Sequence, residues 1–100
     1  MPETPDAELQ EMSERAGMVA QTVMTPGWTQ IIKPALSSRR EGLVKTMLGK
    51  KFENIIDLNY VQQSINAIDA ILTLIETTLA QGKEADQILQ ERLLREQNEH

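Results

Sequence analysis

Residues 58–79, LNYVQQSINAIDAILTLIETTL, decide the fold of this chain. Apolar residues recur here at alternating intervals of three and four, the heptad pattern that places one apolar seam along a helix. The seam consists of Leu58, Val61, Ile65, Ile68, Leu72, Ile75 and Leu79. A second, weaker set lies beside it and consists of Ala67, Ala70, Ile71, Leu74 and Thr78. Only a narrow strip remains polar, so we expect this helix to need neighbours on two sides.

Composition points to the same fold class. The chain has 100 residues, which is enough for one domain at most, and only 3% of them are aromatic. The core must therefore come from aliphatic residues and methionine, which suit helices packed on helices. There is no cysteine, which excludes disulfides, thiol catalysis and cysteine-based zinc sites. We therefore expect an all-α protein.

Two further features of the sequence bear on where the protein works. The first residues, Met1 to Asp6, are acidic and contain two prolines, unlike a secretory signal, so we expect the mature protein to begin here. Asp69 and Glu76 interrupt the most hydrophobic stretch, which leaves no apolar run long enough to span a bilayer. The sequence therefore predicts a soluble, cytoplasmic protein without a membrane partner.

The first 25 residues read as an acidic, amphipathic helix. Thr4, Pro5 and Asp6 form a helix start, with a capping hydroxyl, a proline at the first helical position and an acid near the positive end of the dipole. Gly17 weakens the middle of this helix. Its apolar stripe, at intervals of three and four, is Leu9, Met12, Ala16, Val19 and Val23.

A second helix is expected over residues 26–49. Thr25 can cap it, with Pro26 at the first helical position, and Gly49 is a plausible end. Pro34 lies inside the pattern, where it removes one backbone hydrogen bond, so we expect a kink or a restart near residues 31–34. The stripe of this helix is Trp28, Ile31, Ile32, Ala35, Leu36, Leu43 and Met47. Arg39 falls within this stripe by angle. Either its long stem extends along the apolar surface and keeps the charge in water, or its guanidinium pairs with an acid such as Asp69 or Glu76.

The ends of the central helix are predicted from caps and glycine. Asp57 or Asn59 can cap its start, and Gly82 ends or bends it. Residues 84–97 then form a short C-terminal helix before a loose tail. Between the second and central helices, three apolar residues are expected to close the end of the hairpin: Phe52, Ile55 and Ile56.

Together these signals predict an antiparallel helical hairpin, residues 26–49 against 58–80, with an additional N-terminal helix and a short C-terminal helix. The expected organisation is an acidic arm at 1–25, the hairpin core at 26–82, and a C-terminal helix and tail at 83–100. The thin outer helices cover the central helix poorly, so we expect self-association to bury the rest. The predicted oligomer interface is Leu58, Val61, Ile65, Ile68, Ile71, Leu72, Leu74, Ile75 and Leu79.

Catalytic chemistry is hard to find in this sequence. The one histidine, His100, is the last residue, where nothing fixes it as a base. Asp57, Asp69 and Glu76 could gather around a cation in a bundle, but no Glu-x-x-His pair accompanies them. We therefore expect no enzyme activity, no cofactor, no metal and no small-molecule substrate.

The sequence does not decide whether the basic segment and Trp28 contact a partner. Residues 28–53 hold six bases and two acids in a chain of net charge −5. This basic segment is either a solvated face or a surface for phosphates or an acidic partner. Trp28 either covers the end of the hairpin or anchors in a partner's pocket. The candidate partner contacts are Trp28, Lys33, Arg39, Arg40, Lys45, Lys50 and Lys51.

Residues 26–79 resemble small helical-hairpin proteins of tailed bacteriophages. The resemblance rests on Pro26-Gly27-Trp28, on Val61-Gln62-Gln63, and on the apolar spacing around them. It implies a virion or head-assembly component that works in the host cell by assembling with copies of itself and with other phage structural proteins. The alternatives are a nucleic-acid accessory factor in genome packaging and a regulatory adaptor of a host protein.

Overall fold

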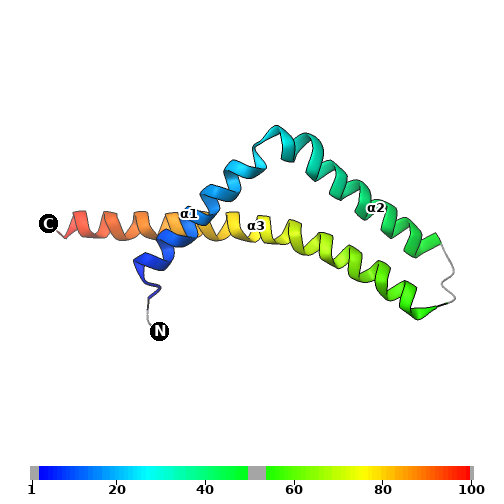
Figure 1. Ribbon diagram of the computed structural model, residues 1–100. Coiled ribbons are helices and arrows are strands. Elements are labelled where there is room, and N and C mark those ends of the chain that lie inside the picture. The colour runs from blue at the N-terminus through cyan, green and yellow to red at the C-terminus, as the bar shows by residue number, and fades with distance from the viewer. Residues whose placement is uncertain (1–2, 50–53, 100) are drawn as a thin grey trace. The chain divides into compact units, whose positions relative to one another are not determined.

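The computed structural model describes residues 3–49 and 54–99, and these ranges contain α-helices and no strand (Figure 1). Helix α1 is Asp6–Val23, α2 is Lys33–Gly49 and α3 is Ile55–Asn98. A π-helical segment, η1, Gly27–Ile32, leads directly into α2. The predicted all-α class is therefore confirmed.

The chain divides into two compact units, and α3 contributes to both. One unit is Met24–Leu74, and the other is Met1–Val23 together with Ile75–His100. We call them the middle unit and the terminal unit. Helix α3 is uninterrupted where the middle unit ends and the second part of the terminal unit begins.

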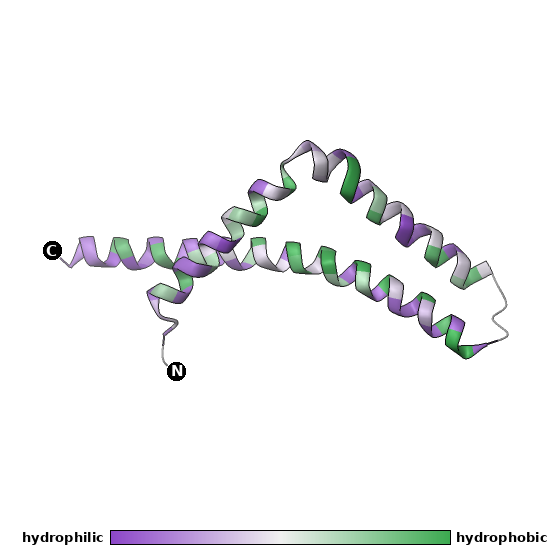
Figure 2. Ribbon diagram, in the orientation of Figure 1, coloured by the Kyte–Doolittle hydropathy of each residue, from purple (hydrophilic) through white to green (hydrophobic). Residues whose placement is uncertain are grey.

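In the middle unit, side chains of α2 meet side chains of the first part of α3. Arg40 pairs with Asp69, whereas Met47, seven residues later on α2, lies beside Gln62, seven residues earlier on α3. Figure 2 shows apolar residues recurring along α3. Three residues of the predicted seam, each 8% exposed, form the core here: Val61, Ile65 and Ile68. The heptad spacing thus produces a packed seam.

The start of the η1–α2 segment follows the sequence signals. The Trp28 N–H donates to Thr25 Oγ1 at 3.3 Å, which confirms Thr25 as the cap. The Lys33 N–H donates to the Trp28 carbonyl, the i to i+5 spacing of a π-helix, and α-helical geometry resumes at Lys33. Pro34 has no N–H for the carbonyl four residues earlier, which explains why the pattern changes within the expected range.

Helix α3 begins earlier than expected. The Ile56 N–H donates to Asn54 Oδ1 at 2.9 Å, so Asn54 is the cap and the prediction of Asp57 or Asn59 was wrong. Ile55 and Ile56 are 72% and 69% exposed, so they do not close the end of the hairpin as expected. Phe52, the third residue of that prediction, lies outside the described residues.

Gly82 does not end the central helix, and the prediction of a separate C-terminal helix was wrong. Helix α3 runs through Gly82 to Asn98, and Gly82 is buried where α1 crosses it. A Cβ atom at Gly82 would lie 2.0 Å from Ala16 Cβ and 3.3 Å from the Met12 carbonyl oxygen. The absent side chain therefore allows the two helices to approach closely.

The terminal unit is held by α1 lying antiparallel to the end of α3. Arg92 donates to the Thr4 carbonyl at 2.8 Å and to the Asp6 carboxylate, while Gly82 meets Ala16 at the other end of the contact. Leu9 and Ala85 are 2% and 1% exposed and form the core of this unit. The apolar stripe of α1 thus packs against α3.

Candidate functional site

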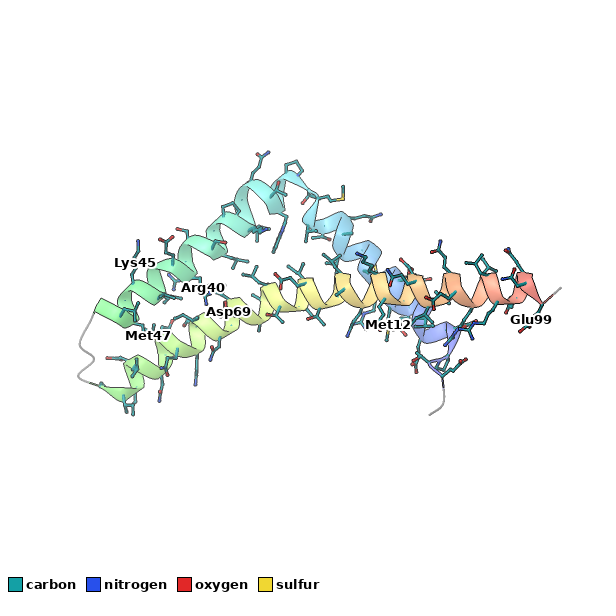
Figure 3. The ribbon with its side chains drawn as sticks, turned by 180° about the vertical axis from the view of Figure 1, so that it is seen from behind. Met12, Arg40, Lys45, Met47, Asp69 and Glu99 are labelled. Atoms are coloured by element: carbon teal, nitrogen blue, oxygen red, sulfur yellow. The ribbon has the colours of Figure 1, made fainter. Side chains whose placement is uncertain are left out.

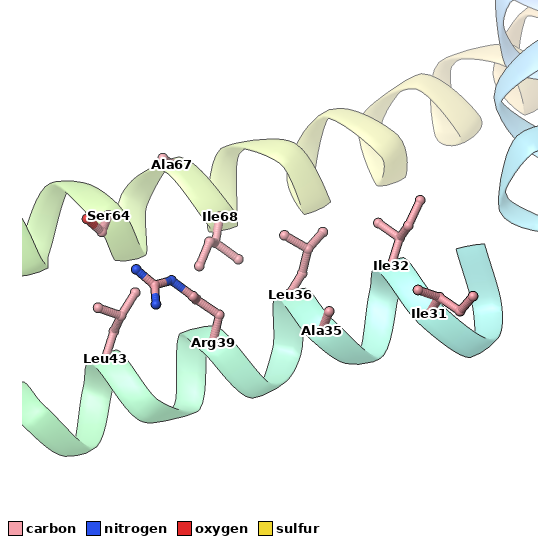
Figure 4. A pocket seen from close by; sticks show the side chains of 9 residues that line it. All are labelled: Ile31, Ile32, Ala35, Leu36, Arg39, Leu43, Ser64, Ala67 and Ile68. Atoms are coloured by element: carbon pink, nitrogen blue, oxygen red, sulfur yellow. The ribbon is translucent and has the colours of Figure 1, made fainter. Parts of the chain in front are cut away.

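The middle unit contains an open, mostly apolar groove between η1–α2 and α3. Its volume is about 530 Å³. The lining residues, shown in Figure 4, are Ile31, Ile32, Ala35, Leu36, Arg39, Leu43, Ser64, Ala67 and Ile68. In that view Ile32, Leu36 and Ile68 project into the space between the two helices.

The groove exists because small residues stand where large ones would fill the gap. Ala35 on α2 and Ser64 and Ala67 on α3 line it. Apolar surface remains uncovered at its edge, since Ile31 is 68% exposed and Ile32 is 49% exposed. Unfilled apolar surface of this kind is typical of interaction sites.

The α3 wall of the groove continues along one face of the helix. Ser64 and Ala67 line the groove, and Ile71 and Leu74 follow at intervals of four and three, which places all four on the same side of α3. Ile71 is 45% exposed and Leu74 is 65% exposed. The second apolar set found in the sequence thus extends the groove surface toward the end of the middle unit.

An ion pair also connects α2 to α3. Arg40 Nε donates to Asp69 Oδ1 at 2.6 Å and Arg40 Nη2 donates to Asp69 Oδ2 at 3.2 Å, with both residues labelled in Figure 3. The hydrogen bond from Arg40 lowers the pKa of Asp69, and the same bond raises the pKa of Arg40. The alternative in which Arg39 pairs with Asp69 was therefore wrong, because the neighbouring Arg40 makes this pair.

This pair predicts a pH dependence of stability. The pKa of Asp69 is lower in the folded chain than in the unfolded chain. The Arg40–Asp69 pair therefore stabilises the folded state above the unfolded pKa, about 4. This stabilisation is lost as the pH falls through the folded pKa. We expect the difference in urea midpoint between the wild type and Asp69→Asn to shrink as the pH is lowered from 6 to 2. A difference that stays constant over this range would contradict the pairing.

Arg39 is left as a charged side chain on an apolar groove. Within residues 3–49 and 54–99, no carboxylate pairs with its guanidinium. In Figure 4 the side chain extends from α2 toward α3. An occupant of the groove that carries an acid next to apolar side chains would meet this cation.

The other candidate contacts are dispersed. Trp28 is half-buried, Lys33 is exposed, and Lys45 pairs with Glu41 at 3.2 Å one turn away on the same helix. Lys50 and Lys51 lie outside the described residues. Among the described residues of the basic segment, Arg39 is the cation that lines the groove, and Arg40 pairs with Asp69.

The predicted interface residues separate into two groups. Val61, Ile65 and Ile68 are core residues of one chain, and four more of the set are half-buried: Leu58, Leu72, Ile75 and Leu79. Ile71 and Leu74 are the exposed members. Of the predicted interface residues, the exposed ones therefore belong to the second apolar set, beside the groove.

No family model matches the chain, and no curated protein or solved structure shows significant similarity to it. Among the residues that the structure describes, no three acidic or histidine side chains lie close enough to hold a metal ion. None of the described helices is both long and apolar enough to cross a membrane.

The apolar residues of the groove are predictable from the sequence, but the groove itself is not. Ala35 and Leu36 were placed on the second helix stripe, and Ala67 in the second set of the central helix. The available signal was the run of small residues Ser64, Ala67 and Ala70 on one side of the seam. Small residues mark positions where a helix is either approached closely or left uncovered, and only the structure distinguishes these.

Proposed function

We propose that this chain is a non-enzymatic assembly protein that acts by binding a second copy of itself and other proteins through the apolar surface of its middle unit. The observation that carries the proposal is the open groove with its exposed lining residues Ile31 and Ile32, together with the exposed Ile71 on the adjoining face of α3. Uncovered aliphatic side chains around a concave surface favour burial against another protein.

The chemistry of the groove favours a protein helix over a nucleic acid. Its lining is aliphatic except for Ser64 and Arg39. The middle unit holds six bases and four acids, a net charge of only +2, which is a weak field for phosphates. An amphipathic helix presents aliphatic residues at intervals of three and four, which is what a groove between two helices accepts.

The proposed biological setting is a tailed bacteriophage. Its support is the resemblance of residues 26–79 to small helical-hairpin proteins of such phages, together with the all-helical fold. In this setting the protein assembles in the cytoplasm of the host cell, with other phage structural proteins as further partners.

Charge substitution at Ile71 and Leu74 tests self-association. We expect the double variant Ile71→Glu, Leu74→Glu to reduce the solution mass to that of the 11.3 kDa monomer, because carboxylates cannot be buried in an apolar interface. Both residues are partly exposed in one chain, so the circular dichroism spectrum should keep its helical signal. Light scattering on a sizing column measures the mass.

Met18→Glu is the matched control, because Met18 is 61% exposed but belongs to α1 in the terminal unit. It should leave the oligomer intact. The proposal is wrong if the double variant keeps the wild-type mass, or if it unfolds while the control does not.

A further inference from the structure

The two units of the chain carry opposite net charge. The middle unit has a net charge of +2, whereas the terminal unit holds eleven acids and four bases, a net charge of −7. When two copies meet, contact between like units is opposed by their charge, and contact between unlike units is favoured. Charge therefore favours the middle unit of one copy against the terminal unit of another.

Within the described part of the terminal unit, the end of α3 carries exposed leucines that suit such a contact. Arg92 of α3 binds Thr4 and Asp6 at the start of α1, and α3 then continues to Asn98, about 9 Å further at 1.5 Å per residue. Leu93 and Leu94 in this extension are 54% and 57% exposed. These two leucines are therefore exposed on the part of α3 that extends beyond the start of α1.

The spacing of this extension matches the groove. On η1 and α2, Ile32, Leu36 and Arg39 line the groove at intervals of four and three. On α3, Leu89, Leu93 and Glu96 follow the same two intervals. Each set presents two aliphatic residues and then a charge, about 10 Å from first to last along its helix, and the two charges are opposite.

We propose that the C-terminal end of α3, residues 89–98 of one copy, occupies the groove in the middle unit of the next copy. Leu93 packs against Leu36, and the Glu96 carboxylate pairs with the Arg39 guanidinium. This inference rests on the proposed self-association and specifies its geometry. Because the groove and the helix end are different surfaces, the contact is heterologous, and repetition of it builds a ring or a filament.

The competing arrangement is a symmetric dimer in which two grooves face each other. It would bury the same aliphatic residues of the groove. However, it would bring two like-charged middle units together and place the Arg39 side chains of the two copies near each other. It would also leave Leu93 exposed. The two arrangements therefore predict different roles for the end of α3.

A mixing experiment separates them. We expect Ile32→Glu, in the groove, and Leu93→Glu, in the helix end, each to be monomeric alone. An equimolar mixture should form a complex of twice the monomer mass, because one intact groove and one intact helix end remain. Leu48→Glu is the control, since Leu48 is 79% exposed and outside the groove, and it should keep the wild-type mass.

Charge exchange gives a second test that requires no loss of folding. Arg39→Glu and Glu96→Arg should each weaken association at least tenfold, and the variant with both substitutions should recover it, because the pair is restored with reversed sign. If the Leu93→Glu variant is still an oligomer, or if the mixture stays monomeric, this inference is wrong but the proposed function is not. A wild type that is monomeric at every concentration overturns the proposed function as well.

Discussion

Gly82→Ala should lower the free energy of unfolding by about 1–3 kcal/mol, the usual cost of forcing a methyl group into a packed contact. The added Cβ would meet Ala16 Cβ at 2.0 Å, so α1 has to move away from α3. The result is diagnostic because the same exchange in an exposed helix is stabilising by about 0.5–1 kcal/mol. Urea denaturation followed by circular dichroism measures the change.

Gly17→Ala supplies the matched control within the same unit. Gly17 lies in α1, and apart from its chain neighbours and the backbone of its own helical turns, no heavy atom of the described residues lies within 4 Å of the position its Cβ would take. This variant should be more stable than the wild type by about 0.5–1 kcal/mol. If both glycine variants are stabilised to the same extent, α1 does not cross α3 at Gly82.

Ile65→Ala should cost about 2–4 kcal/mol, because Ile65 is 8% exposed and its removal leaves a cavity in the core of the middle unit. Ile71→Ala, six residues later on the same helix, should cost less than about 1 kcal/mol in the monomer, since Ile71 is 45% exposed. The comparison holds residue type and helix constant. Denaturation at a concentration low enough to keep the chain monomeric provides both values.

The ratio of these two costs decides which apolar face of α3 is internal. A large cost at Ile65 and a small cost at Ile71 mean that the heptad seam forms the core and that the second set remains available to a partner. Equal costs at the two positions would show that both faces are internal, and would remove the surface on which self-association depends.

The sequence predicted the helices well where spacing alone determines them. The seam through Val61, Ile65 and Ile68 identified the central helix and its core face. The Thr25 cap was also predicted correctly, because capping depends on neighbouring residues alone. Local chemistry of this kind needs no knowledge of the rest of the fold.

The choice between Arg39 and Arg40 could not be made from spacing. Two stripes on the second helix share Leu36 and Leu43 and have the same intervals of four, three and four residues. One stripe passes through Arg39, and the other passes through Arg40 and Met47. Only the position of α3 beside α2 selects the second stripe for the contact. The first stripe is thereby left to line the groove.

The role of Gly82 could not be predicted from the sequence for a related reason. Glycine near the end of an apolar pattern favours a helix terminus, and that local rule predicted two helices where there is one. The residue is instead explained by Ala16, 66 positions away in the chain. A close approach between distant segments is a property of the tertiary fold and leaves no mark on local periodicity.

The most direct test of self-association is the solution mass of the wild-type chain, measured by light scattering across a concentration series at low and high salt. We predict a mass above 11.3 kDa that rises with concentration and persists at high salt, because aliphatic burial supplies most of the stability of the contact. A mass of 11.3 kDa at every concentration and both salt conditions would contradict the proposal.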